Sequence, residues 1–196
     1  MANSSDDLTL TADRTAATAL VATPSDDGIP RRFADFATLG EALDYAATGE
    51  RGLNFHDPRG NLARPYPYRE LREEALDAAY RLIAHGIKPG ERIALVAETS
   101  PEFAALFFGA IYAGAWPVPL PLPTSFGGRG AYVDQLAVQL ASCEPKILFY
   151  PPEIAEMGAD AAAARDVEGI AWDAFAGRPA HAVPLRAPPV EPCAPI

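Results

Sequence analysis

Two short apolar runs constrain the fold of this chain more than any other feature of its sequence. They occupy residues 93–97 and 146–150, and Lys146 is their one polar residue. A strand with water on one face alternates apolar and polar side chains, so a continuous run indicates a strand buried on both faces. Helical patterns separate and flank the two runs. The sequence therefore predicts an α/β fold, a parallel sheet with flanking helices.

Periodic apolar patterns predict the helices. Thr38 and Glu41 form a T-x-x-E capping box at the start of one helix, and Ser100 followed by Pro101 starts another. The inward face of this second helix is expected to consist of Phe103, Phe107, Ala110 and Ile111. The expected helices span residues 39–48, 68–85, 101–113, 131–142 and 152–165.

Shorter strands are expected around this unit. Residues 53–56 and 62–66 predict a small β-hairpin in front of the sheet, closed by a turn that contains Asp57, Pro58 and Gly60. Residues 116–120 are expected to pair on one side at most, because proline cannot donate to a strand ladder and prolines alternate through this segment. A last short strand is expected at residues 169–171.

The chain is expected to divide into three parts. Residues 1–30 mix Ser, Thr, Asp and Ala, which is typical of a flexible N-terminal arm. Residues 31–175 carry the α/β pattern. Residues 176–196 are rich in Ala and Pro, and we expect an extended connection that leads to a missing subdomain.

Charge and composition exclude several classes of protein. A formal net charge of −10 disfavours a nucleic-acid surface, which needs clustered Lys and Arg, and it disfavours anionic membranes. The N-terminus resembles no secretory signal, and no apolar run is long enough to span a bilayer. Cys143 and Cys193 lack the spacing of a metal or redox motif. We expect a soluble cytoplasmic protein.

The chemical inventory is small. The sequence has no G-x-x-x-x-G-K-[ST] loop and no G-x-G-x-x-G fingerprint, and no catalytic, cofactor-binding or metal-binding residue is assigned. A Gly-rich loop before a helix provides candidate substrate-binding residues, because backbone N–H groups and an arginine there would face an anion. The alternative is a plain flexible connection. The candidates are Ser125, Gly127, Gly128 and Arg129.

Other polar groups favour structural roles. The turn at residues 99–102 follows the carboxyl end of a strand, where open α/β sheets bind ligands, but a helix cap explains its residues. Asp77 and Arg81 have the four-residue spacing of a solvated helix face, and Glu70, Glu73 and Glu74 belong to that face. The histidines His56, His85 and His181 are scattered, and Phe103, Phe107 and Phe108 favour the core.

A succession of segments carries more information than any single motif. It consists of a Y-x-E-L at Tyr68–Leu71, a G-I-K-P-G-E-R-I-A-L stretch at residues 86–95, an S-P-E-F at residues 100–103, and G-A-I-Y-A-G-A-W-P-V-P-L at residues 109–120. In this order and spacing, the chain resembles the N-terminal region of the adenylate-forming superfamily, in its fatty acyl-AMP ligase and acyl-CoA synthetase branch. One departure is Pro67, where the family usually has Thr before the tyrosine.

The resemblance implies a parent enzyme that uses ATP and Mg²⁺ to make an acyl-adenylate from a fatty acid. Transfer of the acyl group to coenzyme A or to an acyl carrier protein would follow. The family's phosphate loop, adenine-binding segment, ribose-binding Asp and catalytic Lys all come later than residue 196. We therefore expect a fragment that is inactive alone and that binds neither ATP nor Mg²⁺ tightly.

Two rival hypotheses stand beside this one. The first is a free-standing, non-catalytic α/β binding or interaction module. An exposed apolar face would favour the fragment over the module, because a missing subdomain leaves core uncovered. The second is a small dinucleotide-binding enzyme, which the absent glycine fingerprint disfavours.

Overall fold

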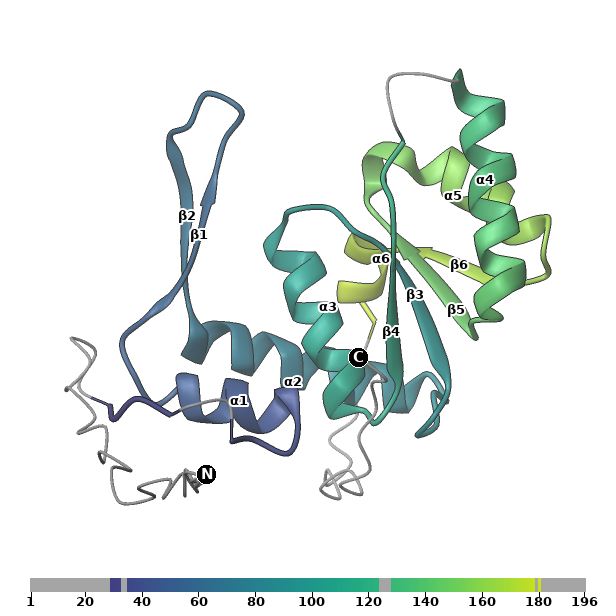
Figure 1. Cartoon of the computed structure of the whole chain (residues 1–196). Helices are drawn as coiled ribbons and strands as arrows, with labels where there is room; N and C mark the ends of the chain where they lie inside the picture. The colour runs from purple at the N-terminus through teal and green to yellow at the C-terminus, as the bar shows by residue number, and fades with distance from the viewer. Residues whose placement is uncertain (1–28, 33–34, 124–127, 179, 181–196) are drawn as a thin grey trace, which may run out of the picture.

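The computed structural model describes residues 29–32, 35–123, 128–178 and 180. Figure 1 shows a mixed α/β fold with two separate sheets. A parallel sheet has the strand order β4-β3-β5-β6, and a two-stranded antiparallel sheet, β1-β2, stands away from it. The predicted fold class is therefore confirmed.

The two apolar runs form the centre of the parallel sheet. They become β3 (Arg92–Val96) and β5 (Ile147–Tyr150), which pair directly with each other. Four residues of β3 and three of β5 have no exposed surface: Ile93, Ala94, Leu95, Val96, Ile147, Leu148 and Phe149. Both faces of this central pair therefore need apolar cover.

Helices supply that cover in two layers. On one face, α2 (Tyr68–Ala84), α3 (Pro101–Tyr112) and α6 (Trp172–Ala176) share a core with Ile93, Leu95 and Phe149. On the other face, α4 (Gly128–Cys143) and α5 (Ala155–Ala163) pack on Ala94, Val96 and Leu148. The result is a three-layer arrangement.

The outer strands limit the sheet at both edges. Among the described residues, β4 (Trp116–Leu120) pairs only with β3, in agreement with the expectation that this proline-containing segment pairs on one side at most. In the part of the chain that the structure describes, β6 (Glu168–Ala171) pairs only with β5. The short η1 (Pro152–Ile154) precedes α5, so the helix expected at residues 152–165 is a 3₁₀ turn followed by an α-helix.

The hairpin consists of β1 (Gly52–His56) and β2 (Leu62–Pro67), and Asp57 closes its turn. The Asp57 carboxylate accepts bonds from the backbone N–H groups of Arg59 and Asn61 at 2.8 and 2.9 Å. Two isolated strands are marginal in water, so the hairpin needs support from elsewhere.

The first turns of α2 give that support. The Tyr66 ring is buried, and its hydroxyl donates to Glu74 at 2.5 Å. Arg64 pairs with Glu74 at 2.7 Å and also with Glu70. Glu70 and Glu74 lie on the predicted solvated face, with 44% and 41% of their side chains exposed, and the structure also uses both to attach β2 to α2. Asp77 and Arg81 keep the predicted surface pair, at 2.8 Å.

The capping predictions are confirmed at both helices. α1 (Leu39–Ala46) begins with the Thr38 hydroxyl accepting from the Glu41 N–H at 3.1 Å. The Ser100 hydroxyl does the same for the Phe103 N–H at 3.2 Å. Each bond satisfies a donor that a helix start leaves without an intrahelical partner.

The predicted inward face of α3 was partly wrong. Ala110 is fully buried, but Phe103, Phe107 and Ile111 are half-buried. The fully covered side also contains Ala105, Leu106, Gly109 and Tyr112. α3 lies against α2 through its small residues, which allow a close helix contact, and the phenylalanines lie at the margin of the core. Phe108 is likewise half-buried.

Gly109 provides the first test of this packing. A Cβ atom added there would lie 2.7 Å from the Ala78 Cβ and 3.0 Å from the Ala75 carbonyl oxygen in α2. We expect Gly109→Ala to lower the free energy of unfolding by about 1–3 kcal/mol, despite the better helix propensity of Ala. Urea unfolding followed by circular dichroism measures the change.

Gly130 is the matched control, because it is also helical but has no atom within 4 Å of an added Cβ. Gly130→Ala should leave stability unchanged or raise it by up to about 1 kcal/mol. An equal loss of stability in both variants would contradict a close α2–α3 contact at Gly109.

Candidate functional site

The carboxyl ends of the parallel strands are the first place to look for a site, because open α/β sheets bind ligands there. β3 leads into Glu98, Thr99 and Ser100, and β5 leads into Pro151 and η1. The Ser100 hydroxyl is engaged in capping α3. The structure thus confirms the capping role that the sequence predicted for this turn.

Three carboxylates influence one another at this edge. Partial burial raises the pKa of the Glu98 carboxyl above its ordinary value, and the negative charges of Glu153 and Glu102 raise it further. A hydrogen bond with Ser100 acts in the opposite direction. Glu153 and Glu102 are exposed. The edge is therefore acidic, and an anionic substrate group would be repelled there unless another group supplied positive charge.

The structure describes two of the four predicted substrate-binding residues. Ser125 and Gly127 lie outside the described residues, whereas Gly128 and Arg129 belong to the first turn of α4. The helix starts three residues before the predicted residue 131, and Gly128 has the positive φ of 70° that favours glycine. The substrate-binding role of this loop stays a prediction.

Arg129 has two acidic neighbours on α5. Its guanidinium donates to Glu156 at 2.5 Å and to Asp160 at 2.7 Å. Carboxylates in these positions compete with any external anion for the guanidinium, and they join α4 to α5 across the surface. The structure thus gives Arg129 a packing role beside the predicted binding role.

The histidines also have structural surroundings. His85 follows α2 and contacts Glu168 of β6 at 2.8 Å and the Arg178 guanidinium at 2.7 Å. His56 ends β1, and His181 lies outside the described residues. Over the part of the chain that the structure describes, no group of three or more His, Cys, Asp or Glu side chains is placed to hold a metal ion. Cys143 is a free, half-buried thiol.

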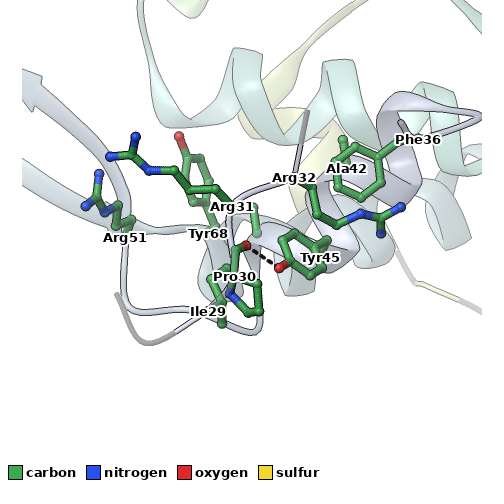
Figure 2. A pocket seen from close by; sticks show the side chains of 10 residues that line it. Ile29, Pro30, Arg31, Arg32, Phe36, Ala42, Tyr45, Arg51 and Tyr68 are labelled. Atoms are coloured by element: carbon green, nitrogen blue, oxygen red, sulfur yellow. Dashed lines mark hydrogen bonds between the residues drawn. The ribbon is translucent and has the colours of Figure 1, made fainter. Parts of the chain in front are cut away.

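A second place, which the sequence patterns did not reveal, is a hollow beside α1 with a volume of about 310 Å³. Figure 2 shows its lining side chains, which come from the segment before α1, from α1 itself, from Arg51 just before β1 and from the start of α2. They are Ile29, Pro30, Arg31, Arg32, Phe36, Ala42, Tyr45, Ala46, Arg51 and Tyr68. Three arginines and three aromatic rings therefore meet at one surface depression.

Comparison with known proteins decides the family. Residues 56–191 match the family model of the AMP-binding enzymes. The chain belongs to the AMP-binding enzyme family. Within this adenylate-forming superfamily, it corresponds to the N-terminal region of the fatty acyl-AMP ligase and acyl-CoA synthetase branch.

Two relatives illustrate the similarity. An acyl-CoA synthetase-like protein of Caulobacter vibrioides is 46% identical over 146 residues, which cover 72% of this chain and 26% of that protein. The long-chain-fatty-acid–AMP ligase FadD32 of Mycolicibacterium smegmatis is 30% identical over 117 residues, or 60% of this chain and 17% of the ligase. The matched region is thus about a quarter or less of either relative.

Solved structures agree with this placement. A structure from work on fatty acyl-adenylate ligases of E. coli and L. pneumophila has a TM-score of 0.75 and 37% identity, and it covers 79% of this chain and 28% of that one. A second ligase structure from L. pneumophila has a TM-score of 0.59 and 19% identity, which supports the fold alone. Among the described helices, none has the length and apolar character of a membrane span.

Glu98 gives a testable consequence of the acidic edge. Its folded pKa lies above its ordinary value of 4.5, so the folded state loses stability as the pH rises through that folded pKa. We expect the Glu98→Gln variant to be more stable than the unsubstituted chain at pH 7, and the difference in stability to disappear below about pH 4. The gain should be small, because water screens a half-buried charge. Thermal unfolding at a series of pH values measures it.

The matched control is Asp134→Asn, which removes one negative charge from an exposed position on α4. This variant should show a smaller change with pH than Glu98→Gln. An equal gain in both variants would mean that net charge, and not the surroundings of Glu98, sets the pH dependence.

Proposed function

We propose that this chain is the N-terminal subdomain of an ATP-dependent acyl-activating ligase. The parent enzyme joins a fatty acid to AMP and releases pyrophosphate, and it then passes the acyl group to coenzyme A or to an acyl carrier protein. Adenylation gives the carboxylate a good leaving group, which it otherwise lacks. In this proposal, residues 31–175 are the subdomain, and residues 176–196 connect it to further parts of a cytoplasmic protein.

The observation that carries the proposal is the likeness to the fatty acyl-adenylate ligase structure at 37% identity and a TM-score of 0.75. Identity at that level extends over most of this chain, so it covers the core and the order of its elements. The match covers only 28% of the ligase chain, which favours a structural role for this region within a larger enzyme. The names of the relatives support a fatty acid substrate.

ATP and Mg²⁺ belong to the parent enzyme in this proposal. Phosphoryl and adenylyl transfer depend on electrostatic stabilisation of the phosphates by cations and backbone N–H groups. The carboxyl edge of this sheet carries Glu98, Glu102 and Glu153 instead, and the described residues contain no cluster that fits a metal ion. We therefore assign no contact with ATP or Mg²⁺ to this chain, and we propose that it is inactive alone.

The exposed apolar residues do not distinguish this proposal from the alternative, a free-standing binding module. Among the described residues, the large apolar side chains that are clearly exposed are Leu39, Leu62 and Val138. They belong to α1, β2 and α4, which Figure 1 shows at different places on the molecule. Single exposed apolar residues are common on monomeric proteins. The fragment proposal thus depends on the comparisons.

A chimeric enzyme tests the proposal. Residues 35–178 of this chain would replace the matched region of the fatty acyl-adenylate ligase that is 37% identical. We expect the chimera to form acyl-adenylate from a fatty acid and ATP within about tenfold of the host rate, because apolar cores tolerate many simultaneous substitutions. Mass spectrometry of the acyl-adenylate measures the rate.

The control chimera carries Phe149→Ala, which removes a fully buried ring from the central strand. It should lose about 3–5 kcal/mol of stability and most of its activity. A well-folded chimera that forms no acyl-adenylate would contradict the proposal and favour the binding module.

A further inference from the structure

The two outer edges of the β1-β2 hairpin differ in chemistry. Among the described residues, β1 and β2 pair only with each other, and Figure 1 shows the hairpin standing away from the parallel sheet. The outer side of an edge strand presents unpaired N–H and C=O groups, to which a further strand can bond. In a strand that is paired on one side, these groups belong to every second residue.

Two backbone bonds show which residues of β1 face its outer edge. Just before β1, the Arg51 carbonyl accepts from the Tyr68 N–H at 2.9 Å. Just after β1, the Asp57 N–H donates to the Asn61 carbonyl, also at 2.9 Å. Both bonds cross the hairpin, so the odd-numbered residues of β1 face β2. Because the direction alternates along a strand, residues 52, 54 and 56 direct their N–H and C=O groups to the outer edge.

The outer edge of β2 is protected against further pairing. Pro65 lies opposite Asn54 and Pro67 lies opposite Gly52, so both prolines occupy outward positions. Proline has no N–H group, and neither position can donate a hydrogen bond to another strand. Natural sheets block their edges with proline or charge in this way. A further strand would therefore not pair with β2.

The outer edge of β1 has neither kind of protection. The strand reads Gly-Leu-Asn-Phe-His and contains no proline, lysine or acidic residue, so its three outward residues each keep a donor and an acceptor. Asn54 and His56 are exposed. One face of the strand is apolar, since Leu53 and Phe55 are half-buried against the core. An open edge beside an apolar face is the kind of edge to which proteins add a strand.

We propose that a further strand of the same polypeptide pairs with the outer edge of β1. Its backbone bonds to residues 52, 54 and 56, and its apolar side chains lie beside Leu53 and Phe55. The strand belongs to the parent ligase, so the proposal rests on the function proposed above. The fatty acyl-adenylate ligase that matches this chain is covered over 28% of its length, which leaves most of that enzyme to supply such a strand.

The small size of the edge favours a partner in the same chain over a separate protein. The five residues of β1 span about 17 Å. A stable complex between separate proteins buries about 1,200–2,000 Å², far more than one short strand provides. A covalently connected strand needs no such area, because its association is intramolecular and the entropy cost is small. A second copy of this chain and a free peptide are therefore disfavoured as partners.

Hydrogen exchange at single amides tests the proposal. The full chain is compared with the chimeric ligase described above, and mass spectrometry with electron-transfer fragmentation resolves neighbouring amides. We expect the Asn54 and His56 amides to exchange quickly in the chain alone and about tenfold or more slowly in the chimera. The Leu53 and Phe55 amides face β2 and serve as the internal control, with equal protection in both proteins.

A proline substitution distinguishes strand pairing from simple covering of the edge. In the chimera, Asn54→Pro removes one outward N–H group, and the His56 amide should lose about tenfold or more of its protection. The matched control is Asn54→Ala, which removes the same side chain, keeps the N–H group and should leave the His56 amide protected. Unchanged protection at Leu53 and Phe55 shows that the hairpin itself remains folded in both variants.

Three results would overturn the proposal. The first is fast exchange of the Asn54 and His56 amides in a folded chimera. The second is equal protection in the chain alone, which would mean that residues 1–196 or a second copy cover the edge. The third is protection at His56 that Asn54→Pro leaves unchanged. Exchange is measured without turnover, so a folded but inactive chimera would contradict the proposed function while this test still decides the partner of β1.

Discussion

The burial of β3 and β5 on both faces is the constraint on which the rest of the structure depends. Their apolar side chains alternate between two cores, with Leu95 and Phe149 in one and Val96 and Leu148 in the other. Each core needs a helical layer. The connections between the parallel strands supply α3, α4 and α5, whereas α2 precedes β3 and α6 follows β6. β4 and β6 form the outer strands of the sheet. Because all neighbouring strands pair in parallel, the carboxyl ends of the four strands lie at the same end of the sheet.

Local signals in the sequence predicted most of this fold. A continuous apolar run, a Ser-Pro helix start and a capping box each depend on neighbouring residues, so they can be recognised without tertiary information. The face of α3 was harder to predict, because this helix is apolar on most sides and its contact with α2 depends on Gly109 meeting Ala78. The short α6 after β6 was also missed, because its five residues give no clear period.

The possible sites depend more strongly on contacts between distant segments. The spacing of Glu70 and Glu74 indicated a solvated helix face, but Arg64 and Tyr66 of the hairpin bind them. The hollow beside α1 combines side chains from residue 29 to residue 68, and no motif links them. Family membership was accessible from the sequence, because the order and spacing of several short segments carried it where no single site residue did.

We propose that this chain is a structural part of an acyl-activating enzyme and that it does not perform the reaction alone. The most direct measurement is acyl-adenylate formation by the purified, folded chain with a fatty acid, ATP and Mg²⁺, followed by mass spectrometry. We expect no acyl-adenylate above the level of a protein-free control. Acyl-adenylate that increases in proportion to the protein concentration would contradict this claim.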